Sequence, residues 1–196
     1  MMPGTLPDLT LEDIARLIQE QPTASRPSVI RRPAAVLVPL IREDGRWSLL
    51  FTRRAETLAN HKGQVSFPGG AVDPQDSSPE ETALREAQEE IGLLPGDVRI
   101  VGRLNYMQTV SNFLITPVVG QMRWPYQFRV SPFEVSRVFT IPMDWLADVR
   151  NREEHPRVFP DGHAENIIYF KPYDGEILWG ASARITVELL KILRIA

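Results

Sequence analysis

The chain has 196 residues, 43% of them hydrophobic and 24% charged, with a formal net charge of −3 at neutral pH. This balance is typical of one folded domain with an added segment and excludes a disordered chain, while the weak negative charge argues against broad binding of nucleic acids. Cysteine is absent, which excludes disulfide scaffolds, cysteine-ligated metal centres and thiol catalysis.

The N-terminal segment is predicted to hold one short helix. Residues 1–10 lack the basic start and apolar run of a signal peptide, and no apolar stretch reaches the length of a membrane span, so we expect a cytoplasmic protein without a membrane partner. Thr10 is the expected N-cap, with Asp13 reaching back to it in a capping box. The proline-containing residues 21–33 read as a linker. We therefore divide the chain into an N-terminal helix and linker, 1–32, and a main domain, 33–196.

The main domain is predicted to alternate between strands and helices. Residues 34–41 and 47–52 are expected to form a hairpin, because turn-forming residues separate two apolar runs. A long, partly basic loop is expected over 53–70, and a helix over about 79–91. Further expected elements are strands near 98–104 and 113–122, a short helix after Pro142, strands flanking the turn at Asp174-Gly175, and a closing helix over 181–193. This order predicts an α/β fold, an α/β/α sandwich with a mixed β-sheet.

Residues at both ends of the helix over 79–91 predict where it begins and ends. Ser78 is a suitable N-cap, Pro79 suits the first helical position, and Glu81 would complete a capping box. Gly92 is expected to supply a left-handed C-terminal cap. One flank of the helix should pack against the sheet through its apolar residues, which are Ala83, Leu84, Ala87 and Ile91.

Three carboxylates share another face of this helix. Glu86, Glu89 and Glu90 lie at positions i, i+3 and i+4, near a helix C-terminus where the dipole disfavours negative charge. Arg85 can pair with Glu89, which leaves two carboxylates uncompensated. A divalent cation would relieve the repulsion, and hard oxygen ligands suit Mg²⁺ or Mn²⁺. The alternative is a solvated acidic face that binds nothing.

The residues before the helix add features that a polyphosphate requires. Gly69 and Gly70 permit close backbone approach, so a glycine carbonyl is a candidate further metal ligand. A basic stripe lies upstream of the acidic segment and consists of Arg53, Arg54, His61 and Lys62. Cations for phosphate oxygens, together with acids for a bridging metal, are the groups that phosphoryl chemistry uses.

Residues 70–93, GAVDPQDSSPEETALREAQEEIGL, resemble the Nudix box. The second half, from Arg85 to Leu93, matches the family pattern closely. The first half is one residue longer than the pattern, and Asp76 takes the place of the family's first glutamate. The resemblance implies a Nudix-like fold and hydrolysis of a nucleoside diphosphate linked to another group.

A narrower resemblance precedes the box. The segment from Leu50 to Gly70 is similar to the signature of the coenzyme A pyrophosphatase branch, although Ala59 replaces an arginine of that signature. Residues 116–120 and 179–184 are also similar to this branch. The likeness implies cleavage of coenzyme A or its derivatives to 3′,5′-ADP and 4′-phosphopantetheine, or its acyl form.

The resemblance also implies roles for individual residues. Metal ligation would fall to Glu86, Glu89, Glu90 and the carbonyl of Gly70, with Arg85 holding Glu89 in place. Glu89 is the first candidate for the general base, and Glu134 is its rival. The candidate substrate contacts are Arg53, Arg54, Lys62 and Gly69.

Several alternatives stay open at this point. A Nudix enzyme of this kind could act on ADP-ribose, NADH, a dinucleotide or a deoxynucleoside triphosphate instead. A non-catalytic Nudix-like ligand-binding module and a structural protein that docks through its acidic face belong to other classes of function. The N-terminal helix could cover the site or contribute to a homodimer.

Overall fold

A mixed β-sheet lies at the centre of the computed structural model, which describes residues 9–22, 31–57, 62–158, 162 and 164–195. The strand order is β3-β2-β1-β7-β5, with β4 on β1, β6 on β7 and β8 on β2. Strand β1 is parallel to β7 and antiparallel to β2. The strands of this sheet are β1 (Arg32–Glu43), β2 (Arg46–Arg54), β3 (Val65–Ser66), β4 (Gly69–Ala71), β5 (Val98–Arg103), β6 (Met107–Gln108), β7 (Phe113–Met122) and β8 (Val135–Pro142).

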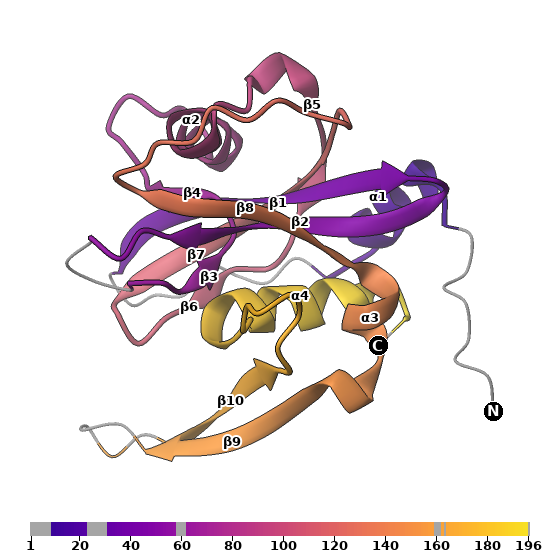
Figure 1. The fold of residues 1–196 in the computed structure, drawn as a ribbon, viewed down its shortest axis with the longest axis vertical. Helices are drawn as coiled ribbons and strands as arrows, with labels where there is room; N and C mark the ends of the chain where they lie inside the picture. The colour runs from indigo at the N-terminus through magenta and orange to yellow at the C-terminus, as the bar shows by residue number, and fades with distance from the viewer. Residues whose placement is uncertain (1–8, 23–30, 58–61, 159–161, 163, 196) are drawn as a thin grey trace.

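Helices cover both faces of the sheet, which confirms the predicted α/β/α arrangement (Figure 1). Helix α2 (Pro79–Ile91) packs on one face. The helices α1 (Leu11–Gln19), α3 (Met143–Ala147) and α4 (Gly180–Ile192) share the core on the other face. Two single-turn helices, η1 (Pro95–Asp97) and η2 (Val149–Asn151), complete the helical elements of the described residues.

Two apolar cores result from the alternation of side chains along the central strands. On β1, Ala35 and Leu37 face α2, whereas Val38 and Leu40 face α4. The α2 side of the sheet meets the predicted apolar flank of that helix, in which Ala83, Ala87 and Ile91 are fully buried. Packing on the sheet therefore fixes the position of α2, and the helix face that carries Glu86, Glu89 and Glu90 remains available for a site.

The N-terminal helix α1 is part of the main core rather than a separate unit. Its predicted capping box forms between Thr10 and Asp13. Ile14 is fully buried, and the indole nitrogen of Trp47 donates to the carbonyl of Leu9 at 2.8 Å. Helix α1 lies in the core opposite α2, so it does not cover the α2 carboxylates. Most of the predicted linker lies outside the described residues.

The sequence reading missed several short or exposed strands. The expected loop over 53–70 contains the end of β2 and the strands β3 and β4. A two-stranded ribbon, β9 (Arg152–Val158) with β10 (Ala164–Phe170), was predicted only at its end, and the residues after Asp174-Gly175 form isolated bridges instead of a strand. No helix within the described ranges is both long and apolar enough to cross a lipid bilayer.

Candidate active site

Helix α2 is fixed at both ends by the residues that the sequence indicated. The Ser78 hydroxyl accepts a hydrogen bond from the Glu81 amide at 3.2 Å, and Gly92 ends the helix in the left-handed region with φ 70°. The other half of the predicted capping box is wrong: the Glu81 carboxylate accepts from the amide and hydroxyl of Ser77 instead of returning to Ser78. Both caps set the register that places Glu86, Glu89 and Glu90.

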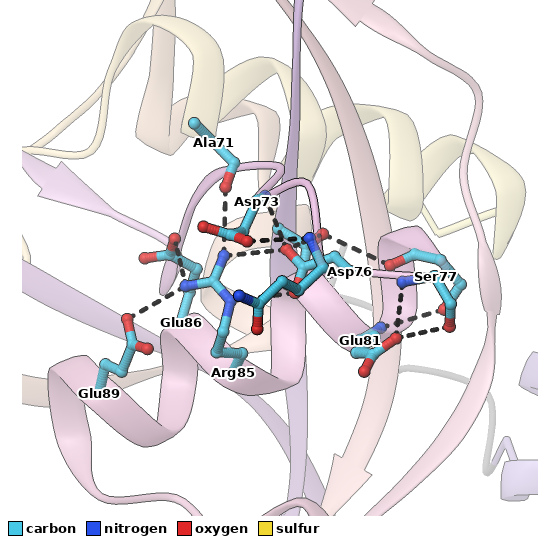
Figure 2. Close-up of polar contacts among 11 residues, drawn as sticks. Ala71, Asp73, Asp76, Ser77, Glu81, Arg85, Glu86 and Glu89 are labelled. Atoms are coloured by element: carbon cyan, nitrogen blue, oxygen red, sulfur yellow. Dashed lines mark hydrogen bonds and ion pairs between the residues drawn. The ribbon is translucent and has the colours of Figure 1, made fainter.

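Arg85 is joined to Asp76 by a bidentate ion pair (Figure 2). Its Nε donates to Oδ1 at 3.1 Å and its Nη2 to Oδ2 at 3.0 Å. The Thr82 hydroxyl and the Asp73 amide also donate to Asp76 Oδ2, each at 2.9 Å. These hydrogen bonds, with Arg85 the largest influence, lower the pKa of Asp76 to about 2. The loop before α2 is thus tied to the middle of the helix.

The rest of the Arg85 guanidinium faces the carboxylate cluster. Nη1 lies 3.0 Å from Glu86 Oε1 and 3.1 Å from Glu89 Oε2, while Nη2 donates to the Ala71 carbonyl at 3.2 Å (Figure 2). The expected pairing of Arg85 with Glu89 is therefore present, and Arg85 partly compensates Glu86 as well. One side chain connects the loop, strand β4 and two of the three glutamates.

Gly69 has no room for a side chain, and a side chain on Gly70 would displace the carboxyl group of Glu86. Strand β4 pairs with β1, and a Cβ on Gly69 would overlap the Ala35 carbonyl. A Cβ on Gly70 would come within 2.5 Å of the Glu86 carboxyl group. Glycine at these positions lets the backbone lie directly against the sheet and the acidic cluster.

Glu90 is the buried member of the cluster. Only 5% of the residue is exposed, and burial is the main cause that raises its pKa to about 8. The guanidinium of Arg54 lies 3.7 Å away and favours the charged form, whereas the charges of Glu86 and Glu134 oppose it. Its Oε2 atom is buried and has no hydrogen-bond partner. A buried acceptor without a donor is the property expected of a group that meets a ligand.

Strand β2 separates the two predicted arginines. Arg54 points to the α2 face and reaches Glu90, while Arg53 points to the other face and contacts Glu56 and Glu176. The pairing of β2 with β8 is irregular between Arg53 and Arg54, and their ion pairs hold the two side chains apart in this structure. Lys62 is exposed, and Ala59 and His61 lie outside the described residues.

Glu134 comes to the cluster from a different part of the chain. It is exposed at the end of the segment before β8, and its negative charge contributes to the raised pKa of both Glu86 and Glu90. The sequence reading named Glu134 but missed how residues 124–134 reach the site. Alternate aromatic residues, Trp124, Tyr126 and Phe128, pack this segment onto the α2 core. That alternation was the available signal.

The carboxylates fit a divalent cation in chemistry, although their side chains do not yet converge. Within the described ranges, no three acidic or histidine side chains stand in a ready-made cation site. Arg85 holds Glu89 to one side, while Glu86 and Glu90 remain beside the backbone of β4. The partnerless oxygen of Glu90 and the all-oxygen donor set suit a divalent cation.

The comparisons with known proteins identify the family of this chain. The family model of the NUDIX domain matches residues 31–162. The chain therefore belongs to the Nudix family, and it is a Nudix hydrolase that acts on nucleoside diphosphate derivatives. Hydrolases of this family generally use divalent metal ions.

Individual relatives cover nearly the whole chain. A protein named Nudix hydrolase NudL, described as uncharacterized, from Enterobacter sp. is 39% identical over 183 residues, covering 93% of this chain and 94% of its own. The protein of the same name from Cronobacter sakazakii is 40% identical over 184 residues, covering 92% and 93%.

Two solved structures support the fold. The Nudix hydrolase RenU from M. smegmatis gives a TM-score of 0.51 at 23% identity, covering 60% of this chain and 74% of that one. A MutT/nudix family protein from Enterococcus faecalis gives 0.52 at 12% identity, covering 93% and 69%.

Proposed function

We propose that this Nudix hydrolase cleaves the pyrophosphate bond of coenzyme A or its derivatives, giving 3′,5′-ADP and 4′-phosphopantetheine or its acyl form. The observation that carries the proposal is the place of the branch-like residues. Arg54 lies beside Glu90, and its amide donates to the Gln64 carbonyl at 2.9 Å. Thr52 donates to the Ser66 carbonyl at 3.2 Å. The segment that resembles the coenzyme A branch thus borders the carboxylate cluster.

The metal shell would consist of Glu86, Glu89, Glu90 and the Gly70 carbonyl. Mg²⁺ or Mn²⁺ bound there would neutralise charge on the phosphate oxygens and lower the pKa of a water molecule. Arg85, anchored by Asp76, would orient Glu89. Glu90 would lose its proton when it binds the cation, because metal ligands must be deprotonated.

The substrate would be held from the basic side of the site. Arg54 and Lys62 would contact phosphate oxygens, and Gly69 would let the diphosphate approach the backbone. Arg53 would reach the substrate only after leaving Glu56 and Glu176 on the other face. We therefore assign the first phosphate contact to Arg54.

Glu89 would take the proton from the attacking water, with Glu134 as the competing candidate. Glu134→Gln separates the two roles, because Glu134 is not among the proposed metal ligands. We expect this variant to keep most of its kcat. A loss of about 100-fold or more at unchanged metal affinity would make Glu134 the general base and remove Glu89 from that role.

A substrate panel tests the proposed function. The full chain is incubated with Mg²⁺ or Mn²⁺ and coenzyme A, an acyl derivative, ADP-ribose or NADH, and products are identified by mass. We expect the highest kcat/KM with coenzyme A or its acyl form and release of 3′,5′-ADP. Preferred cleavage of ADP-ribose or NADH would show that coenzyme A is not the main substrate. If none of the compounds gives a metal-dependent product, the proposal is contradicted.

A further inference from the structure

Phe133 is the most exposed large apolar residue among the described positions, with 79% of its surface open to solvent. It stands at the tip of a tight turn, in which the Glu134 amide donates to the Ser131 carbonyl at 3.1 Å. Pro132 occupies the second position of this turn, where a fixed φ is favourable. The ring is therefore presented outward by a structured turn.

Hydrogen bonds fasten this turn to two elements of the active site. The Ser131 amide donates to the Glu90 carbonyl at 2.8 Å, and the Arg129 amide to the Ile91 carbonyl at 3.0 Å. On the other side, the Ala55 amide donates to the Glu134 carbonyl at 2.8 Å. The turn thus bridges the end of α2 and the end of β2, the two elements that carry Glu90 and Arg54.

The chemistry around Phe133 is that of a nucleotide site. Single exposed apolar residues are ordinary on protein surfaces, so exposure alone means little. Phe133, however, directly precedes Glu134, whose charge acts on Glu86 and Glu90. Trp124, Tyr126 and Phe128 of the same segment pack onto the core, which leaves Phe133 as the aromatic ring of residues 124–134 that faces solvent. A flat apolar ring at this rim matches a planar base.

We propose that Phe133 is a specificity-determining residue that stacks on the nucleobase of the substrate. The ring would bind the base while the carboxylates and Arg54 act on the diphosphate. Base–aromatic stacking tolerates any base, because every base has a π-face. The inference rests on the hydrolysis of nucleoside diphosphate derivatives and does not require that coenzyme A be the substrate.

Two ligands that differ only by the base provide the test. Dissociation constants of both ligands, AMP and ribose 5-phosphate, and of 4′-phosphopantetheine as a third ligand are measured calorimetrically with the full chain and Mg²⁺. We expect AMP to bind more tightly than ribose 5-phosphate to the wild type. Phe133→Ala should weaken the binding of AMP about tenfold and leave the binding of ribose 5-phosphate unchanged, since only the base contact is lost. Phe133→Trp should retain AMP affinity, and Phe133→Leu should not.

Controls separate stacking from other effects. Val158→Ala, at another exposed apolar position, should leave both affinities unchanged; Val158 ends strand β9, in the ribbon on the α4 side of the sheet (Figure 1). The inference is overturned if Phe133→Ala binds AMP as the wild type does, if both ligands weaken equally, or if the wild type shows no preference for AMP. If Phe133→Ala weakens the binding of 4′-phosphopantetheine alone, base stacking is overturned and Phe133 contacts the other end of the substrate. If coenzyme A is not cleaved but the AMP effect appears, the substrate proposal fails and this inference stands.

Discussion

The pKa values of two carboxyl groups in this site are shifted in opposite directions by their surroundings. The guanidinium of Arg85 lowers the pKa of Asp76 to about 2, whereas burial raises the pKa of Glu90 to about 8. Asp76 therefore acts as a permanent anion that anchors Arg85. The raised pKa favours the protonated form of Glu90 near neutral pH in the metal-free protein, and Glu90 would lose this proton if it binds the proposed cation.

The raised pKa of Glu90 predicts how the stability of the metal-free protein depends on pH. The folded-state pKa lies above the ordinary value of 4.5, so the contribution of the protonated group is complete below pH 4.5 and is lost as the pH rises through 8. We expect Glu90→Gln to unfold at higher urea than the wild type at about pH 9 in EDTA, with little difference at about pH 5. The same difference in urea midpoint between Glu90→Gln and the wild type at both pH values would contradict the burial argument.

The lowered pKa of Asp76 predicts the opposite dependence. Its contribution is present above the ordinary value of 3.8 and is lost as the pH falls through 2. Asp76→Asn should lower the free energy of unfolding at neutral pH by about 1–3 kcal/mol, because it breaks a charged bidentate contact. It should also lower kcat, since Arg85 loses its anchor. Asp44→Asn, in the turn between β1 and β2, is the control and should change neither quantity.

For individual residues, the sequence predicted which side chains carry the candidate site better than it predicted their contacts. The pairing of Arg85 with Glu89 follows from helical spacing and is present. The contact of Glu81 with Ser77 was not predictable, because Ser77 and Ser78 both suit the cap. The burial of Glu90 depends on how the sheet and Arg54 close over it, which no local pattern reports.

The element that carries the site is also the element best specified by its own sequence. Helix α2 begins and ends where Ser78 and Gly92 predict. The short strands β3, β4 and β6 were missed, because strands of two or three residues carry no periodicity. Strand β9 was missed for another reason: six of its seven residues are exposed, so it lacks alternation between buried and exposed positions.

The end of α2 gives a prediction with a matched control. Gly92 has φ 70°, and a Cβ there would lie 2.8 Å from the Cβ of Arg129. Gly92→Ala should therefore lower the free energy of unfolding by about 1–3 kcal/mol and loosen the turn that carries Phe133. Gly96→Ala meets nothing within 4 Å and should be nearly neutral. Equal melting temperatures for the two variants would contradict this account.

In the whole molecule, the proposed active site and the larger apolar core lie on opposite faces of the sheet. The sandwich was predictable from the order of elements, and the seating of α1 in the main core was not, because its apolar stripe could equally have met a second copy. The proposed cleavage site lies on the α2 face, whereas α1 and α4 complete the core on the other face.

This separation predicts a variant that is unstable but active. Ile14→Ala should cost about 2–5 kcal/mol of stability, since Ile14 is fully buried between α1 and the sheet. At a temperature where the variant remains folded, its kcat and KM should match the wild type. Arg16→Ala, an exposed change on the same helix, should leave the melting temperature nearly unchanged. A selective loss of kcat in Ile14→Ala would show that α1 influences catalysis.

The strand that carries Arg53 and Arg54 limits how the chain length can vary. Between Gly70 and α2 an extra residue is tolerated, because Asp76 still reaches Arg85 through its side chain. An inserted residue between the β1–β2 turn and Arg53, where β2 pairs regularly with β8, would move each following residue by one position. Arg54 would then leave Glu90, and Arg53 would take its place. Functional relatives should therefore differ in length before α2 while keeping the count of residues between the β1–β2 turn and Arg54 constant.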